Sequence, residues 1–290
     1  MESLGGKGMI KLFKRSPLPF QGQKRYWIPK LLELSREIPE GATIVDVFGG
    51  SGLCANTFKF ARPDCRVIWN DFDDFRSRLE KIPQTNVFAS ELGAILGKYE
   101  KGARITPGED DHGCIVALFE RAEVEGADMH TLAQSVTFSG DSTSKITPQR
   151  ILYNNMGSTC YDATGYLEGV ERVSLHFQEL LPSLPEDAIL VLDPPYLSTD
   201  VGRYGQKQEG VYWGVAEHLR LVRNLVGMKY LYFTSDKSEV LKMEEVAREA
   251  FGVSWFGEYR TFSRRAHMCG KDSQSYTDIL ITNIPDSSLF

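Results

Sequence analysis

The sequence predicts an α/β fold, with a doubly wound sheet that is mixed but mostly parallel. Four short apolar runs each stop abruptly at an aspartate, and they cover residues 42–46, 66–71, 188–193 and 229–236. Their apolar character is continuous rather than alternating, which is typical of strands that are buried on both faces in a parallel sheet. Helical patterns separate these runs, and strands that alternate with helices give this fold class.

Two helices and a final hairpin can be placed from local signals. The first helix is expected over residues 30–37, directly after Pro29, because proline favours the first turn of a helix. A second helix is expected over residues 214–227. Its apolar face would carry Ala216, Leu219, Val222 and Leu225. Near the end of the chain, EYRTFSRR and YTDILITN flank a polar loop, which indicates an antiparallel pair of strands.

The alternation of strands and helices weakens in the middle of the chain. The stretches GARITPGEDDHG and FSGDSTSKITPQ are rich in Gly, Ser, Thr, Asp and Pro, which is typical of loops. We therefore expect a main domain formed by residues 1–86 and 178–290, with an inserted region over residues 87–177.

Composition excludes some classes of protein. The chain has 290 residues with 42% hydrophobic content, so it can bury a substantial core and is not generally disordered. Its 33 Lys and Arg against 39 Asp and Glu give a net charge of −6, which argues against a non-specific nucleic-acid coat protein. No apolar run has the ~18–20 residues of a membrane span, and no secretory signal is evident. We expect a cytoplasmic protein.

The cysteines do not form a recognisable metal or disulfide pattern. They are odd in number and widely scattered, with no C-x-x-C pair, so we expect reduced, structural cysteines and no metal site. They are Cys54, Cys65, Cys114, Cys160 and Cys269.

An aspartate ends each of the four predicted strands. If the strands are parallel, these residues lie along one edge of the sheet, where α/β folds bind their ligands. They are Asp46, Asp71, Asp193 and Asp236. The alternative is that each aspartate only caps the helix or turn that follows it.

The first chemical signal is the turn DVFGGSG, which covers residues 46–52 after the first predicted strand. Its glycines allow the backbone to approach a ligand, and the following helix offers free N–H groups. The spacing is neither G-x-G-x-x-G nor a phosphate loop with a lysine. Asp71, after the second strand, stands where an acidic residue accepts ribose hydroxyls in nucleoside-binding folds.

The second signal is DPPY, from Asp193 to Tyr196, at the end of a strongly apolar strand. Pro194 and Pro195 have no backbone N–H, so carbonyl oxygens and the Asp193 carboxylate leave a pocket of acceptors. Such a pocket suits an amino group with two N–H bonds, and Tyr196 can stack on the ring that carries it. A strand that simply ends at two prolines beside a buried tyrosine is the alternative.

The order of these motifs resembles the S-adenosylmethionine-dependent DNA N6-adenine methyltransferases of the Dam-like group. DVFGGSG, NDFDD, an insertion and LVLDPPY follow one another in that order. The resemblance covers both ends of the chain and the DPPY strand, essentially everything outside the insertion. It implies a Rossmann-like methyltransferase fold with an inserted target-recognition region over residues 87–177.

The resemblance also implies roles for single residues. The family's F-x-G-x-G loop matches Phe48, Gly50 and Gly52. SPLPFQGQKRYW is similar to the family's aromatic-x-G-G-K element, although Gln23 replaces its second glycine. The resemblance implies that the catalytic residues are Asp193, Pro194, Pro195 and Tyr196. It implies that S-adenosylmethionine is bound by Phe20, Lys24, Asp46, Phe48, Gly50, Gly52, Asp71, Phe177 and Asp193.

The implied reaction is methyl transfer to an adenine that is flipped out of duplex DNA, without a metal or a covalent enzyme intermediate. Cys54 would then be a bystander. Cytosine N4, an RNA or a small molecule stay open as targets, and so does a catalytically silent DNA binder. The recognition sequence, a partner restriction endonuclease, a phage or solitary role and the oligomeric state also stay open. Candidate phosphate or base contacts are Arg104, Lys145, Arg150, Arg264 and Arg265.

Overall fold

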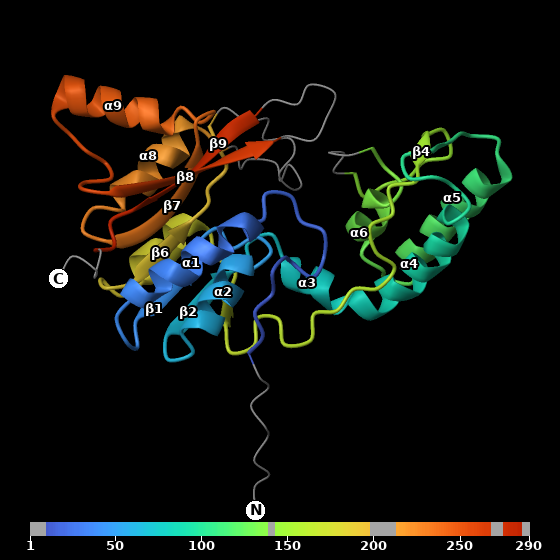
Figure 1. Cartoon of the computed structure of the whole chain (residues 1–290), viewed down its shortest axis with the longest axis horizontal. Coiled ribbons are helices and arrows are strands. Elements are labelled where there is room, and N and C mark those ends of the chain that lie inside the picture. The colour runs from blue at the N-terminus through green and yellow to red at the C-terminus, as the bar shows by residue number, and fades with distance from the viewer. Residues whose placement is uncertain (1–9, 139–142, 198–212, 268–274, 286–290) are drawn as a thin grey trace, which may run out of the picture. The chain divides into compact units, whose positions relative to one another are not determined.

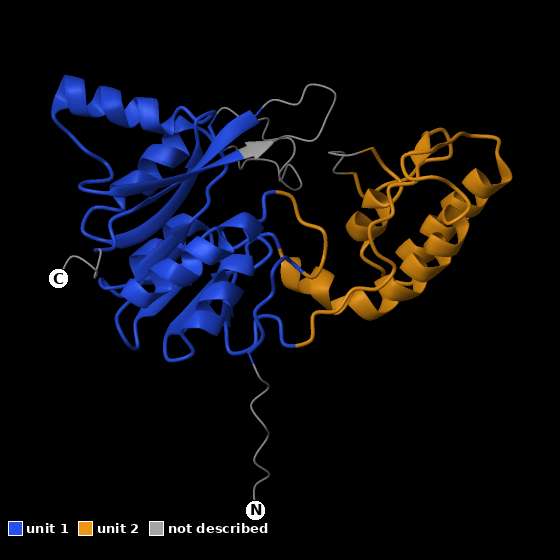
Figure 2. Cartoon of the chain, in the orientation of Figure 1, with its two compact units in different colours: residues 1–16, 22–73, 165–290 blue, residues 17–21, 74–164 orange. Residues whose placement is uncertain are grey.

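The computed structural model describes residues 10–138, 143–197, 213–267 and 275–285. The chain divides into two compact units, which Figure 2 shows in blue and orange. Unit 1 comprises residues 1–16, 22–73 and 165–290, and unit 2 comprises residues 17–21 and 74–164.

These boundaries differ from those expected at residues 87 and 177. Helix α4 (Ile82–Leu96) already belongs to unit 2 and runs through position 87. Strand β5 (Glu171–Val173) lies before position 177 but pairs with the main sheet of unit 1. Neither boundary coincides with a change in composition. At the first boundary, the apolar pattern of α4 is like that of a helix in the main domain.

Unit 1 is built on a seven-stranded sheet in the order β5-β2-β1-β6-β7-β9-β8 (Figure 1). The first five strands in this order are parallel, and β9 runs antiparallel to both of its neighbours, β7 and β8. This arrangement confirms the expected mixed, mostly parallel sheet. Besides β5, the strands of this sheet are β1 (Thr43–Asp46), β2 (Arg66–Asn70), β6 (Ile189–Leu192), β7 (Lys229–Ser235), β8 (Arg260–His267) and β9 (Ser275–Thr282).

The central strands are buried on both faces, as their continuous apolar runs predict. All four residues of β6 are buried. Leu190 and Leu192 join one core with helices α7 (Phe177–Leu180) and α8 (Val215–Arg223). On β7, Phe233 points the other way and packs against Trp27, which precedes helix α1 (Ile28–Leu34). Helices therefore cover both faces, as in a doubly wound fold.

Helix α8 corrects one sequence prediction. It is shorter than the expected range 214–227, and half of the predicted apolar face is wrong: Val222 and Leu225 are buried, but Ala216 is exposed and Leu219 is 41% exposed. The buried positions are His218, Leu221, Val222 and Leu225. The reason is that a buried histidine stands at the start of the true stripe, and its polar side chain hides the pattern.

The end of unit 1 contains one predicted and one unpredicted element. Strands β8 and β9 pair antiparallel, which confirms the expected hairpin, although the joining residues 268–274 lie outside the described residues. Helix α9 (Val240–Phe251) was not expected. It ends at Gly252, whose left-handed φ of 64° is a common helix stop.

Unit 2 is mainly helical. Its helices are α3 (Phe75–Glu80), α4, α5 (Asp110–Val124) and α6 (Met129–Gln134), and a short antiparallel pair joins β3 (Arg104–Ile105) to β4 (Leu152–Tyr153). The expectation of a loop throughout GARITPGEDDHG is wrong, because α5 begins at Asp110. Asp110 and Asp111 stand in the first turn, where carboxylates are favoured by the helix dipole.

The described cysteines are all unpaired thiols. Cys54 and Cys65 are buried, Cys114 and Cys160 are exposed, and all four are free thiols, whereas Cys269 lies outside the described residues. Within the described part of the chain, no helix combines the length and apolarity that crossing a bilayer requires.

Candidate functional site

The carboxyl ends of β1, β2 and β6 bring three of the four predicted aspartates to one edge of the sheet. These strands are neighbours, with Asp46 in register with Trp69 on one side and Val191 on the other. Asp71 and Asp193 directly follow β2 and β6. Asp236, which follows β7, is exposed. The edge where α/β folds bind ligands therefore carries carboxylates, as predicted.

A short ion pair at this edge joins Lys24 to Asp193. Lys24 Nζ lies 2.5 Å from Asp193 Oδ2, and the two side chains are only 12% and 26% exposed. Lys24 Nζ also donates to the Gly22 carbonyl oxygen at 3.1 Å. The lysine of the N-terminal motif and the aspartate of DPPY, far apart in sequence, are thus a close ion pair.

Burial and charge act in opposite directions on this pair. Burial alone lowers the pKa of Lys24, but the Asp193 carboxylate more than offsets it, so the pKa of Lys24 is raised. Burial raises the pKa of Asp193, while the charge and hydrogen bond of Lys24 oppose that rise. Lys24 is consequently a firmly charged partner that favours the ionised form of Asp193.

The rest of the DPPY motif surrounds this pair. Pro194 is buried, and Pro195 and Tyr196 are half-buried. The Tyr196 hydroxyl donates to the Thr234 carbonyl oxygen at 3.4 Å, a weak hydrogen bond. Lys24 Nζ lies 5.8 Å from the centroid of the Tyr196 ring. Carboxylate, ammonium and aromatic ring are therefore neighbours.

The glycine turn after β1 requires glycine at three positions. Gly50 and Gly52 have positive φ values of 44° and 78°. At Gly49, a Cβ atom would overlap the indole ring of Trp69 and lie 3.0 Å from the Asn70 carbonyl oxygen. Sequence reasoning singled out Gly50 and Gly52 but missed Gly49, because its constraint comes from a side chain on β2.

Asp46 caps helix α2 (Leu53–Ala61), as the alternative interpretation of these aspartates proposed. Its Oδ2 accepts from the Ala55 backbone N–H at 3.2 Å across the glycine turn. Burial raises the pKa of Asp46 to about 7, and the hydrogen bond from Ala55 partly opposes this. Asp46 thus fixes the turn through the start of α2, where its charge meets the positive end of the helix dipole.

An aromatic cluster lies beside the turn. Phe48 packs on Phe177 with ring centroids 5.9 Å apart and on Trp213 at 5.3 Å, and Phe177 meets Trp213 at 5.4 Å. Phe177 is only 4% exposed. Trp213 Nε1 is buried without a hydrogen-bond partner among the residues that the structure describes. Phe72, which sequence reasoning missed, is an exposed aromatic side chain directly after Asp71.

Asp71 is fully buried and paired with a protein side chain. Its Oδ2 accepts from Arg172 Nε at 2.8 Å, and its backbone N–H donates to the Val173 carbonyl oxygen at 2.8 Å. Its neighbour Asn70 donates to the carbonyl oxygens of Val47 and Leu175 at 2.9 Å each. The loop that follows β2 is therefore tied to β1 and to the segment after β5.

The remaining predicted residues lie in separate places. Phe20 belongs to unit 2 and packs edge-to-face on Phe75 with centroids 5.4 Å apart, so its role toward a cofactor stays a prediction. In unit 2, Arg104 and Lys145 are exposed and Arg150 is half-buried. Arg264 and Arg265 lie on β8 in unit 1, with Arg265 exposed.

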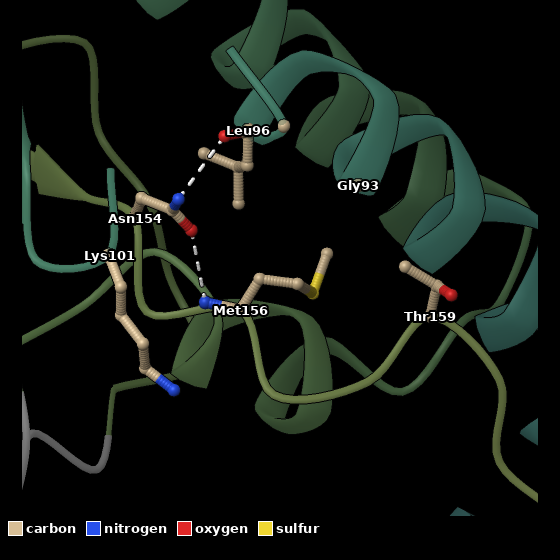
Figure 3. A pocket seen from close by; sticks show the side chains of 7 residues that line it. Gly93, Leu96, Lys101, Asn154, Met156 and Thr159 are labelled. Carbon is tan, nitrogen blue, oxygen red and sulfur yellow. Dashed lines mark hydrogen bonds between the residues drawn. The ribbon is translucent and has the colours of Figure 1, made fainter. Parts of the chain in front are cut away.

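Unit 2 has a hollow of its own, shown in Figure 3. It is about 160 Å³ in volume and lies beside α4. Asn154 holds its floor by donating to the Leu96 carbonyl oxygen at 3.2 Å and accepting from the Met156 N–H at 3.3 Å (Figure 3). At its rim, a Cβ on Gly93 would lie 2.5 Å from Thr159, so Gly93 is needed for close packing. None of the predicted site residues lines it.

The donor set of the described residues favours an organic cofactor. Within the described ranges, no three His, Cys, Asp or Glu side chains come together as metal ligands. The glycine turn instead lets a ligand approach the backbone. Trp213 offers a buried indole N–H as a donor, and the half-buried Phe48 offers an aromatic surface. Such a combination is typical of sites for nucleoside-containing cofactors.

Comparison with known proteins gave one strong relative. No family model matches the chain. The chain is 32% identical over 295 residues to a Haemophilus influenzae protein that bears the name "Putative methyltransferase", and the match covers 97% of this chain and 96% of that protein. Among solved structures, precorrin-6y C5,15-methyltransferase from Geobacter metallireducens matches with 10% identity and a TM-score of 0.36, over 94% of this chain and 97% of that one. A likeness of that size carries no argument about substrate.

Proposed function

The chain belongs to the methyltransferase family of its Haemophilus influenzae relative, and from that premise we propose that it is a DNA adenine methyltransferase of the Dam-like group. It would transfer a methyl group from S-adenosylmethionine to the N6 amine of an adenine in duplex DNA. Unit 2 would recognise the target sequence.

The observation that carries this proposal is the Lys24–Asp193 pair at the start of DPPY. The 2.5 Å contact is made to Oδ2 of the carboxylate. A carboxylate fixed through one oxygen can accept a hydrogen bond from an amine through the other. Pro194 and Pro195 add no backbone donors, so an exocyclic amine suits this position better than a carbonyl substrate does.

The cofactor fits the glycine turn and the aromatic cluster. Gly50 and Gly52 give the backbone a tight turn at the end of β1, and Phe48 offers a half-buried aromatic surface next to it. Nε1 of Trp213, which has no hydrogen-bond partner within the described ranges, supplies a buried donor in the same cluster. When bound, S-adenosylmethionine supplies an electrophilic methyl group on its sulfonium.

The residues of the chain then act by positioning. Asp193 accepts an N–H of the adenine amine, turns the nitrogen lone pair outward and stabilises the positive charge that develops on nitrogen. Tyr196 stacks on the base, whose extrusion from the duplex costs a few kcal/mol. Alignment of two bound reactants can lower a barrier by about 7–11 kcal/mol, so the reaction needs no strong base at this site.

Mass spectrometry of methylated nucleosides tests this function. The protein is incubated with S-adenosylmethionine and unmethylated duplex DNA of varied sequence, and the DNA is digested to nucleosides. We expect N6-methyldeoxyadenosine with the wild-type protein and none with Asp193→Ala. Asp236→Ala is the matched control, because it removes an exposed carboxylate from the end of the adjacent strand β7 and should keep activity.

Other products would redirect the assignment. N4-methyldeoxycytidine would keep the DNA substrate but change the base. A methylated base only in RNA, or methyl transfer only to a small amine, would overturn the DNA proposal while preserving the methyltransferase family. Cofactor binding without any methylated product would favour a silent DNA-binding relative.

A further inference from the structure

Cationic and aromatic side chains alternate where the 3₁₀ turn η1 (Arg25–Trp27) and helix α1 meet the edge strand β8. The guanidinium carbon of Arg264 lies 4.3 Å from the centroid of the Tyr26 ring, and Lys30 Nζ lies 4.3 Å from the centroid of Phe262. Phe262 and Arg264 share one face of β8, because alternate residues of a strand point the same way. This row belongs entirely to unit 1.

Tyr26 gathers two positive charges on an exposed ring. Its side chain is 58% exposed, and the guanidinium carbon of Arg25 lies 4.5 Å from the ring centroid, close to the 4.3 Å of Arg264. Arg25 Nη2 also donates to the Tyr26 hydroxyl at 2.7 Å. The ring and the hydroxyl therefore hold both guanidinium groups in place at the surface.

Among the described residues, only Arg264 of this pair has a carboxylate partner. Arg264 Nη1 lies 3.4 Å from Asp278 Oδ2, at the outer limit of a hydrogen bond. Arg25 makes no ion pair with any carboxylate in the described part of the chain. Two like charges held on one ring repel each other, and an anion that binds both relieves that repulsion.

The position of this cluster links it to the site. Arg25 directly follows Lys24, the partner of Asp193, and Asp278 lies close enough to Lys24 for its pKa to respond to the lysine charge. The chain as a whole carries a charge of −6, so bulk attraction does not bring a polyanion to this edge. A local cationic cluster must do so if the substrate is a nucleic acid.

We propose that Arg25, Tyr26 and Arg264 form a phosphate-binding site for the backbone of the nucleic-acid substrate, beside the Lys24–Asp193 pair. The proposal rests on the proposed function and names the part of unit 1 that holds the duplex. Guanidinium groups bind phosphate oxygens through two N–H donors, and contacts of this kind position a duplex without reading its sequence. Arg25 and Tyr26 directly follow the aromatic-x-G-G-K element and are not among its positions.

Salt dependence of binding to a labelled duplex tests this site. Binding of wild-type protein, Arg25→Gln and Arg25→Lys to the same duplex is measured with S-adenosylmethionine present, over a series of salt concentrations. We expect Arg25→Gln to weaken binding about tenfold, as loss of one charge-assisted contact does. The slope of log K against log salt should fall by about one, the contribution of one phosphate contact. Arg25→Lys should recover most of that slope.

Three controls make the result specific. Arg36→Gln removes an exposed arginine just past the far end of α1 and should leave affinity and slope unchanged. Arg25→Gln should weaken binding to a target duplex and to a scrambled duplex equally. Arg264→Gln should lower the slope as Arg25→Gln does, although it also frees Asp278.

The possible results separate this inference from the proposed function. If Arg25→Gln binds DNA with the affinity and salt slope of the wild type, the phosphate site is overturned. The proposed function still stands in that case, provided that the wild-type protein methylates DNA. Equal losses of DNA affinity and salt slope in Arg25→Gln and Arg25→Lys would also overturn the phosphate site, since the charge of residue 25 would then not be the cause. A loss confined to the target duplex would indicate base contact instead of phosphate contact. Absence of any wild-type binding to DNA would remove the proposed function and this site together.

Discussion

Lys24 Nζ lies 2.5 Å from Asp193 Oδ2, and this pair joins the N-terminal motif to the DPPY motif at the end of β6. The two side chains are largely buried, so each depends on the other for its charged state. A lysine in this position supports the ionised carboxylate that an amine substrate requires. The pair therefore brings the lysine of the N-terminal motif and the aspartate of DPPY into direct contact.

Lys24→Met should shift the pH dependence of methyl transfer. Without the ammonium group, burial of Asp193 is no longer opposed, so the pKa of its carboxyl rises further and the acidic limb of kcat moves to higher pH. At pH 7, kcat should fall about a hundredfold, because a larger fraction of the Asp193 carboxyl is protonated and the group is less well placed. Measurement of kcat from pH 5 to pH 9 checks this. Lys242→Met removes an exposed ion pair with Glu239 and should keep the wild-type pH profile. An unchanged acidic limb in Lys24→Met would contradict this role of Lys24.

The two aspartates at neighbouring strand ends should have different roles. Asp193→Ala should abolish methyl transfer and leave affinity for S-adenosylmethionine largely intact, whereas Asp71→Asn should weaken that affinity about tenfold or more. Titration calorimetry with the cofactor measures both. Because Arg172 holds Asp71, Arg172→Gln is the matched control, and it should cost less affinity than Asp71→Asn. Equal losses of cofactor affinity in both aspartate variants would disprove the division.

Gly49→Ala should destabilise the protein. The added Cβ would overlap the buried Trp69 ring, which cannot move without disturbing β2, so we expect a loss of about 1–3 kcal/mol in the free energy of unfolding. Urea unfolding measures this. Gly113→Ala, inside α5 with open space around its Cβ, should instead stabilise by about 0.5–1 kcal/mol. A neutral Gly49→Ala would show that the turn is looser than described.

His218 should make stability depend on pH. Burial lowers the pKa of His218 to about 4, and the ring meets the Tyr232 hydroxyl at 3.3 Å and the Trp255 ring. The pKa of His218 is lower in the folded state than its usual 6.5, so the unfolded state binds the proton more readily. The free energy of unfolding is therefore at its full value above pH 6.5 and falls as the pH drops toward 4. The loss should reach about 3 kcal/mol at pH 4.

Two measurements check the His218 prediction. The imidazole proton resonances of His218 should titrate near pH 4 in NMR spectra. The free energy of unfolding should decline less between pH 6.5 and pH 4 in His218→Gln than in the wild type, which separates this residue from Asp46 and the other carboxyls. A midpoint near 6.5 would contradict burial of the ring.

The main sheet was predictable because its central strands are uninterrupted apolar runs. β1, β2, β6 and β7 were each expected within one or two residues of their bounds. β5 was missed because its residues Glu171 and Arg172 are exposed at the edge of the sheet and carry no apolar signal. The helices of unit 2 were missed because α5 begins with acidic residues in a stretch that resembles a loop.

The site was predictable as a set of motifs and not as a geometry. Phe48, Gly50, Asp71 and Asp193 could be located from their place after predicted strands. Nothing in the sequence could show that Lys24 pairs with Asp193 or that Gly49 lies against Trp69, because these contacts depend on how segments far apart in the chain pack. The same holds for the two arginines that meet on Tyr26.

The most direct test of the central claim uses two matched duplexes and S-adenosylmethionine with a labelled methyl group. One duplex contains adenine, and in the other every adenine is replaced by purine, which lacks the exocyclic amine that Asp193 is proposed to hold. The account predicts label in the first duplex and none in the second, with loss of label in Asp193→Ala. Equal labelling of both duplexes, or labelling of neither, would contradict it.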